Sequence, residues 1–237
     1  MVAKRELAGK QYRHELKYII SEGEHKLLST RIKACLKQDY HASINGGEYF
    51  IRSLYFDDPF DSALWEKSSG VASRDKFRIR IYNHSDDAIK LERKHKEGQY
   101  IKKDSVSISR EDCDAIIRGN CDCLKSNDSP FAMQFYGIFK ANHLRPKVLV
   151  DYVREPYVFP AEDVRITFDK NVRTAMRCTE LFNPNAITYP VWDLNGCMIL
   201  EIKFNESLPQ YVQELLTLGA AQRTAASKYV FCRQYEF

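Results

Sequence analysis

The sequence predicts an α+β protein built mainly from antiparallel strands. Charged and apolar residues alternate in many segments, which is the period of a strand with one buried face. Helical segments lie between these strands, and polar or glycine-containing turns separate successive ones. The segment 74–83, RDKFRIRIYN, is the clearest case, with four cations at every second position. Like charges on one face repel each other, so the pattern raises the question of what compensates them.

The first elements are well marked. Residues 11–20 alternate and predict a strand, and residues 21–36 predict a helix. In that helix Ser21 is the N-cap and Glu24 completes a capping box. Residues 48–57 predict the next strand.

The remaining elements follow the same signals, with proline starting and glycine ending the short helix after the second strand. In order, we expect a helix over 58–70, strands over 73–82, 87–96 and 99–108, helices over 109–119 and 129–143, strands over 145–159, 163–174 and 197–205, and a helix over 208–219. The segment 224–237 fits no element clearly. No internal repeat or low-complexity linker appears, so residues 1–237 are expected to form a single domain.

Composition restricts the class of protein. The chain has 237 residues, of which 44% are hydrophobic and 12% aromatic, enough to bury a core. Its net charge of +4 is only mildly basic and does not by itself indicate nucleic acid. The distribution of charge is therefore more informative than the sum.

The cysteines and the amino end indicate a reducing compartment. The seven cysteines form an irregular set, and the first residues contain no apolar core of a signal peptide. Cys113, Cys121 and Cys123 lack the CxxC and histidine spacing of a zinc site. No apolar run approaches the length of a membrane span. We therefore expect a cytoplasmic protein with free thiols.

Most predicted strands are charged on one face and apolar on the other. Lys90, Glu92, Lys94 and Lys96 share a face in one strand. Two arrangements satisfy this pattern. In the first, an open antiparallel sheet exposes its charged face to solvent. In the second, the sheet closes into a barrel with a cationic interior, which is costly unless water or a polyanion fills it. The pattern alone leaves both open.

Eight segments in order carry a resemblance to a known family: RHELKY, SLYFDD, KFRIRIY, LERKHKEG, YVREPY, VRITFD, ILEIKF and SKY. From about residue 12 to 230 the chain resembles the vacuolar transporter chaperone (VTC) domain, a polyphosphate polymerase branch of the triphosphate tunnel metalloenzyme, or CYTH-like, superfamily. The resemblance implies a closed antiparallel barrel of about eight strands with helices outside and a tunnel lined by basic side chains. It also implies synthesis of polyphosphate from ATP with a divalent metal, Mn²⁺ or Mg²⁺.

The resemblance also indicates site residues. The implied catalytic cations are Arg78, Arg80, Arg154, Arg165 and Lys203. The implied phosphate-binding residues are Lys17, Lys67, Lys94, Lys102 or Lys103 (where the register is unclear), Ser227 and Lys228, and the implied metal ligand is Glu201. The ExExK signature of the superfamily reads Arg13-Glu15-Lys17 here. The loss of the first glutamate matches the VTC branch and argues against an ordinary triphosphatase.

The chemistry is consistent with these assignments. Polyphosphate carries about one negative charge per phosphoryl unit, which arginine and lysine neutralise. The chain has no Walker loop, so side chains must bind the phosphates. Phosphoryl transfer depends on positioning, charge neutralisation and a metal. Glu201 could instead pair with Lys203 or an arginine. Glu15 and Glu92 are expected to order neighbouring cations, and Asp169 to accept hydrogen bonds.

The sequence is compatible with three functions. The first is a polyphosphate polymerase that uses ATP. The second keeps the tunnel for a triphosphatase or polyphosphatase, or for a subunit that binds polyphosphate without turnover. The third, a nucleic-acid-binding barrel, is disfavoured because the basic strands lack interleaved exposed aromatics. A separate membrane protein is the partner through which such a domain would reach the inner membrane face.

Overall fold

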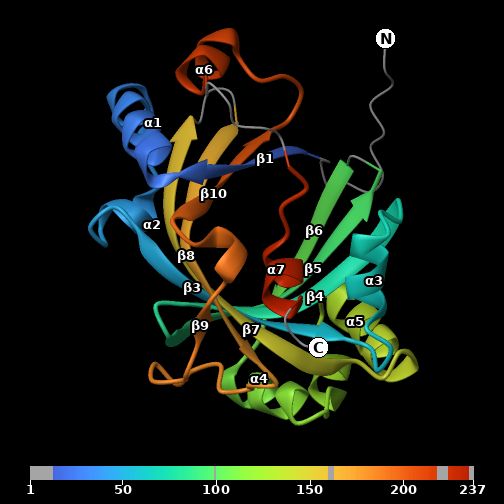
Figure 1. Ribbon diagram of the computed structural model, residues 1–237. Coiled ribbons are helices and arrows are strands. Elements are labelled where there is room, and N and C mark those ends of the chain that lie inside the picture. Colours follow the sequence, from blue (N-terminus) through green and yellow to red (C-terminus); the bar gives the residue numbers. More distant parts are fainter. Residues whose placement is uncertain (1–12, 99, 160–162, 218–223, 235–237) are drawn as a thin grey trace.

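The computed structural model describes residues 13–98, 100–159, 163–217 and 224–234 (Figure 1). In this part of the chain one sheet contains ten antiparallel strands. They are β1 (His14–Ser21), β2 (Lys37–Gln38), β3 (Tyr49–Asp57), β4 (Ser73–Tyr82), β5 (Ser85–Glu97), β6 (Tyr100–Ser107), β7 (Arg145–Phe159), β8 (Val164–Met176), β9 (Tyr189–Pro190) and β10 (Cys197–Phe204).

The sheet curls back on itself. Eight strands follow the order β1-β10-β8-β7-β3-β4-β5-β6, while β2 pairs with β7 and β9 pairs with β8. The two ends of this order meet where Arg13 forms an isolated bridge with Ile101. An ion pair between Glu15 of β1 and Lys94 of β5 crosses the same seam. The expected tunnel barrel with an antiparallel wall is therefore the observed architecture.

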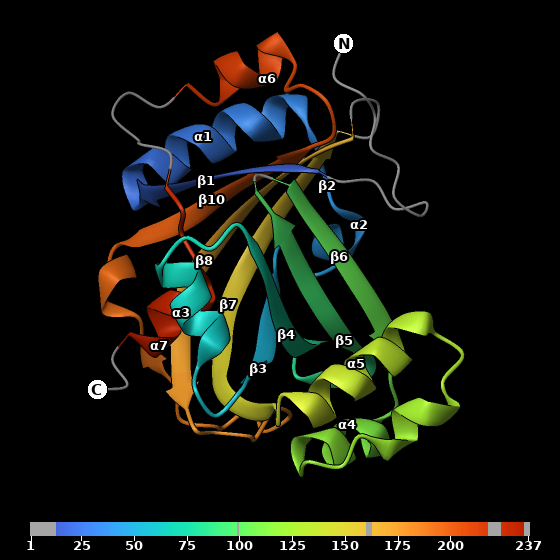
Figure 2. The ribbon, with the colours of Figure 1, turned by 90° about the vertical axis from the view of Figure 1, so that its right-hand side faces the viewer.

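Helices pack against this wall, most of them on its outside (Figure 2). They are α1 (Glu22–Cys35), α2 (Tyr40–Ser43), α3 (Ser62–Ser68), α4 (Arg110–Ile117), α5 (Pro130–Ala141), α6 (Gln210–Leu215) and α7 (Lys228–Arg233), with 3₁₀ turns η1 (Asp122–Ser126) and η3 (Trp192–Leu194). Figure 2 shows α1 and α6 beside β1 and β10, and α4 and α5 at the opposite end of the molecule. None of the helices in the described ranges has the length and apolarity needed to cross a membrane.

The predicted strand faces are confirmed. Phe77, Ile79 and Ile81 of β4 point outward into a core formed with α4 and α5, which includes Phe135 and Phe139. A second outer core joins α1 and α6 to the apolar faces of β1, β8 and β10. In α1 the Ser21–Glu24 capping box is present. Burial of these outward apolar rows leaves the charged rows on the concave inner side.

The inner side is not charged along its whole length. Ile51, Val148 and Val150 point inward near one end of the barrel, where they pack against Tyr229 and Cys232. These two residues belong to α7, which lies within the curve of the sheet in Figure 1. The charged-face pattern did not predict this third core. The carboxyl-terminal helix therefore fills one end of the interior, and the cationic residues occupy the rest.

Several boundaries differ from the expected ones. The segment 224–237, which fitted no element clearly, contains α7. The helix expected over 208–219 is observed over Gln210–Leu215, and its expected end at Gly219 lies outside the described residues. The short elements β2, α2 and β9 were not predicted, because two to four residues carry too little periodic pattern.

Candidate active site

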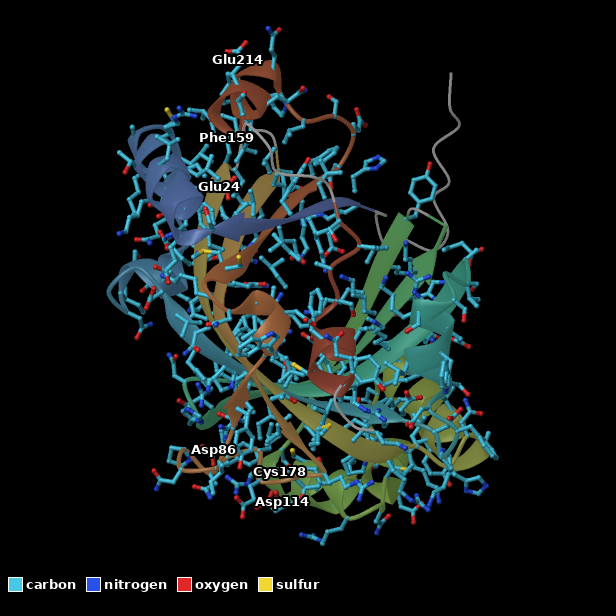
Figure 3. The ribbon with its side chains drawn as sticks, viewed as in Figure 1. Glu24, Asp86, Asp114, Phe159, Cys178 and Glu214 are labelled. Atoms are coloured by element: carbon cyan, nitrogen blue, oxygen red, sulfur yellow. The ribbon has the colours of Figure 1, made fainter. Side chains whose placement is uncertain are left out.

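The barrel encloses a cavity of about 630 Å³ on its charged side. Among the described residues that line it, eleven are lysine or arginine and two are glutamate. The cations are Lys17, Lys67, Arg74, Lys76, Arg78, Arg80, Lys94, Lys96, Arg154, Lys203 and Lys228, and the glutamates are Glu15 and Glu201. In Figure 3 many side chains project into the space between β1 and β4, whereas the labelled Glu24, Asp86 and Glu214 lie at the periphery.

The structure brings together most of the residues that the family resemblance indicated. Ten of these thirteen line the cavity: Lys17, Lys67, Arg78, Arg80, Lys94, Arg154, Glu201, Lys203, Ser227 and Lys228. They come from β1, α3, β4, β5, β7, β10 and the segment that leads into α7. Residues that are far apart in sequence therefore share one cavity because the sheet closes.

Three indicated residues lie outside the cavity lining. Lys103 shares the inner face with Lys94, but its half-exposed side chain is held by the carboxylate of Glu92. Lys102 is opposite His95 in the same ladder, and alternation places it on the outer face. The register therefore places Lys103 on the inner face and Lys102 on the outer face, which the sequence alone could not decide.

Arg165, the third of these residues, is engaged elsewhere. Its guanidinium donates to Asp39 at 3.1 Å and to the Tyr49 hydroxyl at 3.2 Å. The position next to β2 explains this contact, since Asp39 directly follows that short strand. Arg165 is opposite Lys203 in the ladder and shares its face, but it does not line the cavity.

The cations of β4 are compensated by groups on the neighbouring strands. Arg78 donates through Nε to Glu92 at 2.7 Å and through Nη1 to the Tyr55 hydroxyl at 2.8 Å. Arg80 donates to the Tyr152 hydroxyl at 3.0 Å. Burial raises the pKa of Glu92, but the charges of Arg78, Arg80 and Lys103 outweigh it and hold that pKa well below its ordinary value. One buried carboxylate thus fixes two guanidinium groups toward the interior.

A second ionic cluster joins β1, β5 and β10. The Glu201 carboxylate lies 2.6 Å from Lys203 and 3.3 Å from Lys17, and Glu15 lies 2.7 Å from Lys94. Burial raises the pKa of Glu201, yet the neighbouring lysines keep it well below its usual range. Glu201 therefore pairs with Lys203, which was the alternative to metal binding, and Glu15 orders Lys94 as expected.

The third cluster depends on Asp169, whose side chain is fully buried. Arg154 donates two hydrogen bonds to its carboxylate, at 2.7 and 2.8 Å. Lys228 forms an ion pair with the same carboxylate. Asp169 therefore accepts hydrogen bonds, as expected from the sequence, and it orients both Arg154 and Lys228.

The segment before α7 enters the cavity and is held by polar contacts. The Thr224 backbone N–H donates to the Lys17 carbonyl at 2.9 Å. The Lys17 ammonium donates to the Ala226 carbonyl at 3.2 Å, and the Lys76 ammonium donates to the Ser227 hydroxyl at 2.9 Å. This segment therefore forms one wall of the cavity.

Sequence reasoning left out some lining residues. Arg74, Lys76 and Lys96 also line the cavity. Their signal was visible, because Arg74 and Lys76 continue the alternation of Arg78 and Arg80. The family motif indicated only the last two arginines of that row.

The residues available for a metal are few. Within the described ranges no group of three or more histidine, cysteine or acidic side chains is arranged to hold one. Glu15 and Glu201 both lie within 3.4 Å of the Lys17 ammonium. A hard divalent cation is commonly held by one or two carboxylates together with phosphate oxygens. The donor set fits a metal that arrives with a phosphate substrate.

Comparison with known proteins agrees with this geometry. The family model of the VTC domain matches residues 12–237. The chain belongs to the VTC domain family. No curated protein matches it.

Solved structures show the same fold as this VTC domain. A putative adenylyl cyclase from Hippeastrum, described as having a dominant triphosphatase activity, superimposes with a TM-score of 0.55 at 15% identity, covering 94% of this chain and 95% of the other. A putative adenylate cyclase from Bacillus halodurans gives 0.51 at 14% identity, covering 88% and 89%. At these identities the likeness concerns the fold alone. Family, fold and cavity together describe a tunnel protein suited to triphosphate and polyphosphate anions.

Proposed function

We propose that this VTC domain is a polyphosphate polymerase, which transfers the γ-phosphoryl group of ATP to the end of a growing polyphosphate chain. The observation that carries the proposal is the cavity, in which eleven lysines and arginines face two glutamates among the described lining residues. Such an excess of positive charge suits a ligand with about one negative charge on each phosphoryl unit.

The reaction needs few protein groups. A terminal oxygen of the acceptor chain forms a bond to the γ-phosphorus, and the bond from that phosphorus to the β–γ bridging oxygen breaks. ADP leaves with the electron pair, and the acceptor is longer by one phosphoryl unit. The acceptor oxygen is already anionic, so catalysis consists of positioning and charge neutralisation.

The clusters around the cavity suggest roles for individual residues. Arg78 and Arg80, held by Glu92 and the tyrosine hydroxyls, would neutralise the transferred phosphoryl group together with Arg154 and Lys203. Their anchors fix the direction of each guanidinium before substrate enters. The remaining cations would hold the other phosphates of ATP and the acceptor: Lys17, Lys67, Lys94 and Lys228, with Ser227.

Glu201, with Glu15 beside it, would hold the Mn²⁺ or Mg²⁺ that accompanies ATP. When bound, such a cation neutralises phosphate oxygens and orients them. Lys17 and Lys203 already neutralise Glu201. Neither glutamate of the described lining is therefore a free base for activating water, which favours transfer to an anionic acceptor over hydrolysis.

Incubation of the purified protein with ATP and Mn²⁺, followed by gel electrophoresis, tests the proposal. A ladder of polyphosphate with equivalent ADP supports it. Free phosphate without a ladder would assign the cavity to a triphosphatase or polyphosphatase instead. Polyphosphate binding without turnover would assign it to an anion-binding subunit.

A matched pair of variants locates the activity. Arg78→Ala removes a cavity guanidinium and should abolish the ladder. Arg31→Ala removes an exposed arginine from α1, outside the barrel, and should leave the ladder intact. Equal activity of both variants would exclude the cavity as the active site.

A further inference from the structure

Three lysines lie side by side on the inner face of the barrel. In the ladder Lys76 of β4 is opposite Lys94 of β5, which is opposite Lys103 of β6. Like charges directly opposite each other destabilise a sheet unless they are compensated. Glu15 compensates Lys94, and Glu92 compensates Lys103. Among the residues that the structure describes, no carboxylate forms an ion pair with Lys76.

Neutral groups hold Lys76 instead. Its ammonium donates to the Ser227 hydroxyl at 2.9 Å and lies 5.2 Å from the centre of the Tyr229 ring. A hydroxyl and a ring face orient an ammonium group without cancelling its charge. An incoming anion can therefore replace these contacts without breaking an ion pair. At Lys17 and Lys94, by contrast, an anion would have to compete with a buried carboxylate that already pairs with the lysine.

We propose that Lys76 is a phosphate-binding residue of the cavity, and that it exchanges its hydrogen bond to Ser227 for one to a phosphate oxygen. This inference rests on the proposed function, since the ligand is the phosphate chain of the substrate or product. The family motif does not indicate Lys76. Its position suits the role, because it lies two residues before Arg78 on the same face of β4.

The charges around Lys76 give this exchange a measurable signature. Burial lowers the pKa of Lys76 well below its ordinary value, and neighbouring cations lower it further. The neighbouring cations are Lys17 of β1, Lys94 of β5, Lys67 of α3 and Arg74 of its own strand. Ser227 and Tyr229 face it from the carboxyl-terminal segment.

A bound phosphate reverses this effect. The negative charge of the ligand raises the pKa of Lys76, so the protein takes up a proton as the anion binds. Affinity should be highest at a pH below the pKa of Lys76 in the empty cavity. It should fall as the pH rises through that value. A side chain that merely supports the fold would not change the number of protons taken up.

Calorimetric titration with tripolyphosphate at several pH values between 6 and 10, each in two buffers of different ionisation enthalpy, measures affinity and proton uptake together. Lys76→Met should bind about tenfold more weakly, because one charged hydrogen bond is lost. Lys76→Arg should bind within about threefold of the unchanged protein but take up fewer protons, because arginine stays charged. Lys26→Met, on the exposed face of α1, is the matched control and should change neither quantity.

The outcomes separate this inference from the proposed function. Burial also lowers the pKa of Lys94 to about 8, so the difference between the unchanged protein and Lys76→Arg isolates Lys76. If tripolyphosphate does not bind the unchanged protein, the proposed function fails and this inference with it. If it binds, but Lys76→Met has unchanged affinity or Lys76→Arg unchanged proton uptake, the role of Lys76 is refuted while the proposed function stands. If Lys76→Met does not fold, the proton uptake of Lys76→Arg alone tests the role of Lys76.

Discussion

Replacing Asp169 with asparagine should destabilise the protein strongly, because its carboxylate is the common partner of two buried cations. It accepts hydrogen bonds of 2.7 and 2.8 Å from Arg154 and pairs with Lys228 on α7. The side chain of Asp169 is 0% exposed, and those of Arg154 and Lys228 are each 9% exposed. Asparagine has nearly the same volume, so the substitution removes charge without creating a cavity.

The expected size follows from this burial. Removing one partner of a buried ion pair costs about 3–5 kcal/mol, because the remaining charge stays out of water. Asparagine can still accept one hydrogen bond from Arg154, so the loss should lie near the lower limit, about 3 kcal/mol. For a chain of this length such a loss lowers the melting temperature by roughly 6–12 °C.

Guanidinium unfolding followed by circular dichroism measures the free energy of unfolding of both proteins. Asp163→Asn is the matched control, since Asp163 is 50% exposed and pairs with the 40% exposed Arg13. That surface pair should contribute only about 0–1 kcal/mol. An Asp169→Asn protein that is no less stable than the Asp163→Asn control would refute the reasoning.

The pH dependence provides a second check on Asp169. Burial raises its pKa, but the charges of Arg154 and Lys228 outweigh that effect and hold the pKa below its ordinary value. The stabilisation is therefore fully present above about pH 4, the region of the unfolded pKa, and is lost as the pH falls through the folded one. The difference between the unchanged protein and Asp169→Asn should shrink below pH 4. A constant difference would mean that the charge is not its cause.

Three other features of the structure can be tested by substitution. Glu201→Gln should lower the rate of ladder formation by about a hundredfold or more, with its circular dichroism spectrum unchanged. Activity retained in that variant would remove Glu201 from the site. Lys103→Met should weaken tripolyphosphate binding more than Lys102→Met, because only Lys103 lies on the inner face; calorimetry that ranks them in the opposite order would contradict the register. Ser21→Ala should lower the free energy of unfolding by about 1 kcal/mol, since it removes the capping box of α1, and an unchanged denaturation midpoint would argue against that contribution.

Local sequence patterns were sufficient to predict much of the fold. Alternation in β4 was sufficient to assign Arg78 and Arg80 to one face and Phe77 and Ile79 to the other, because side chains of a strand point to opposite sides in turn. The start of α1 followed from Ser21 and its capping partner for an equally local reason. The family resemblance then indicated ten residues that line the cavity.

Other features could not be predicted from neighbours in the chain. Alternation could not decide between Lys102 and Lys103, because a shift of register by one residue reverses every side chain of a strand. The carboxyl-terminal residues show no strong periodicity, and α7 is only six residues long. Its place inside the barrel depends on packing against Ile51 and Val150, which are distant in sequence.

The sequence by itself determined the alternating faces, the main helices and the membership of the VTC family. Only the tertiary structure decided which cations share a cavity and which carboxylates compensate them. Lys94 meets Glu15 across 79 positions of the chain, and Lys17 meets the Ala226 carbonyl across 209. The reason is physical: a strand fixes the direction of its own side chains, whereas their partners depend on the register and closure of the whole sheet.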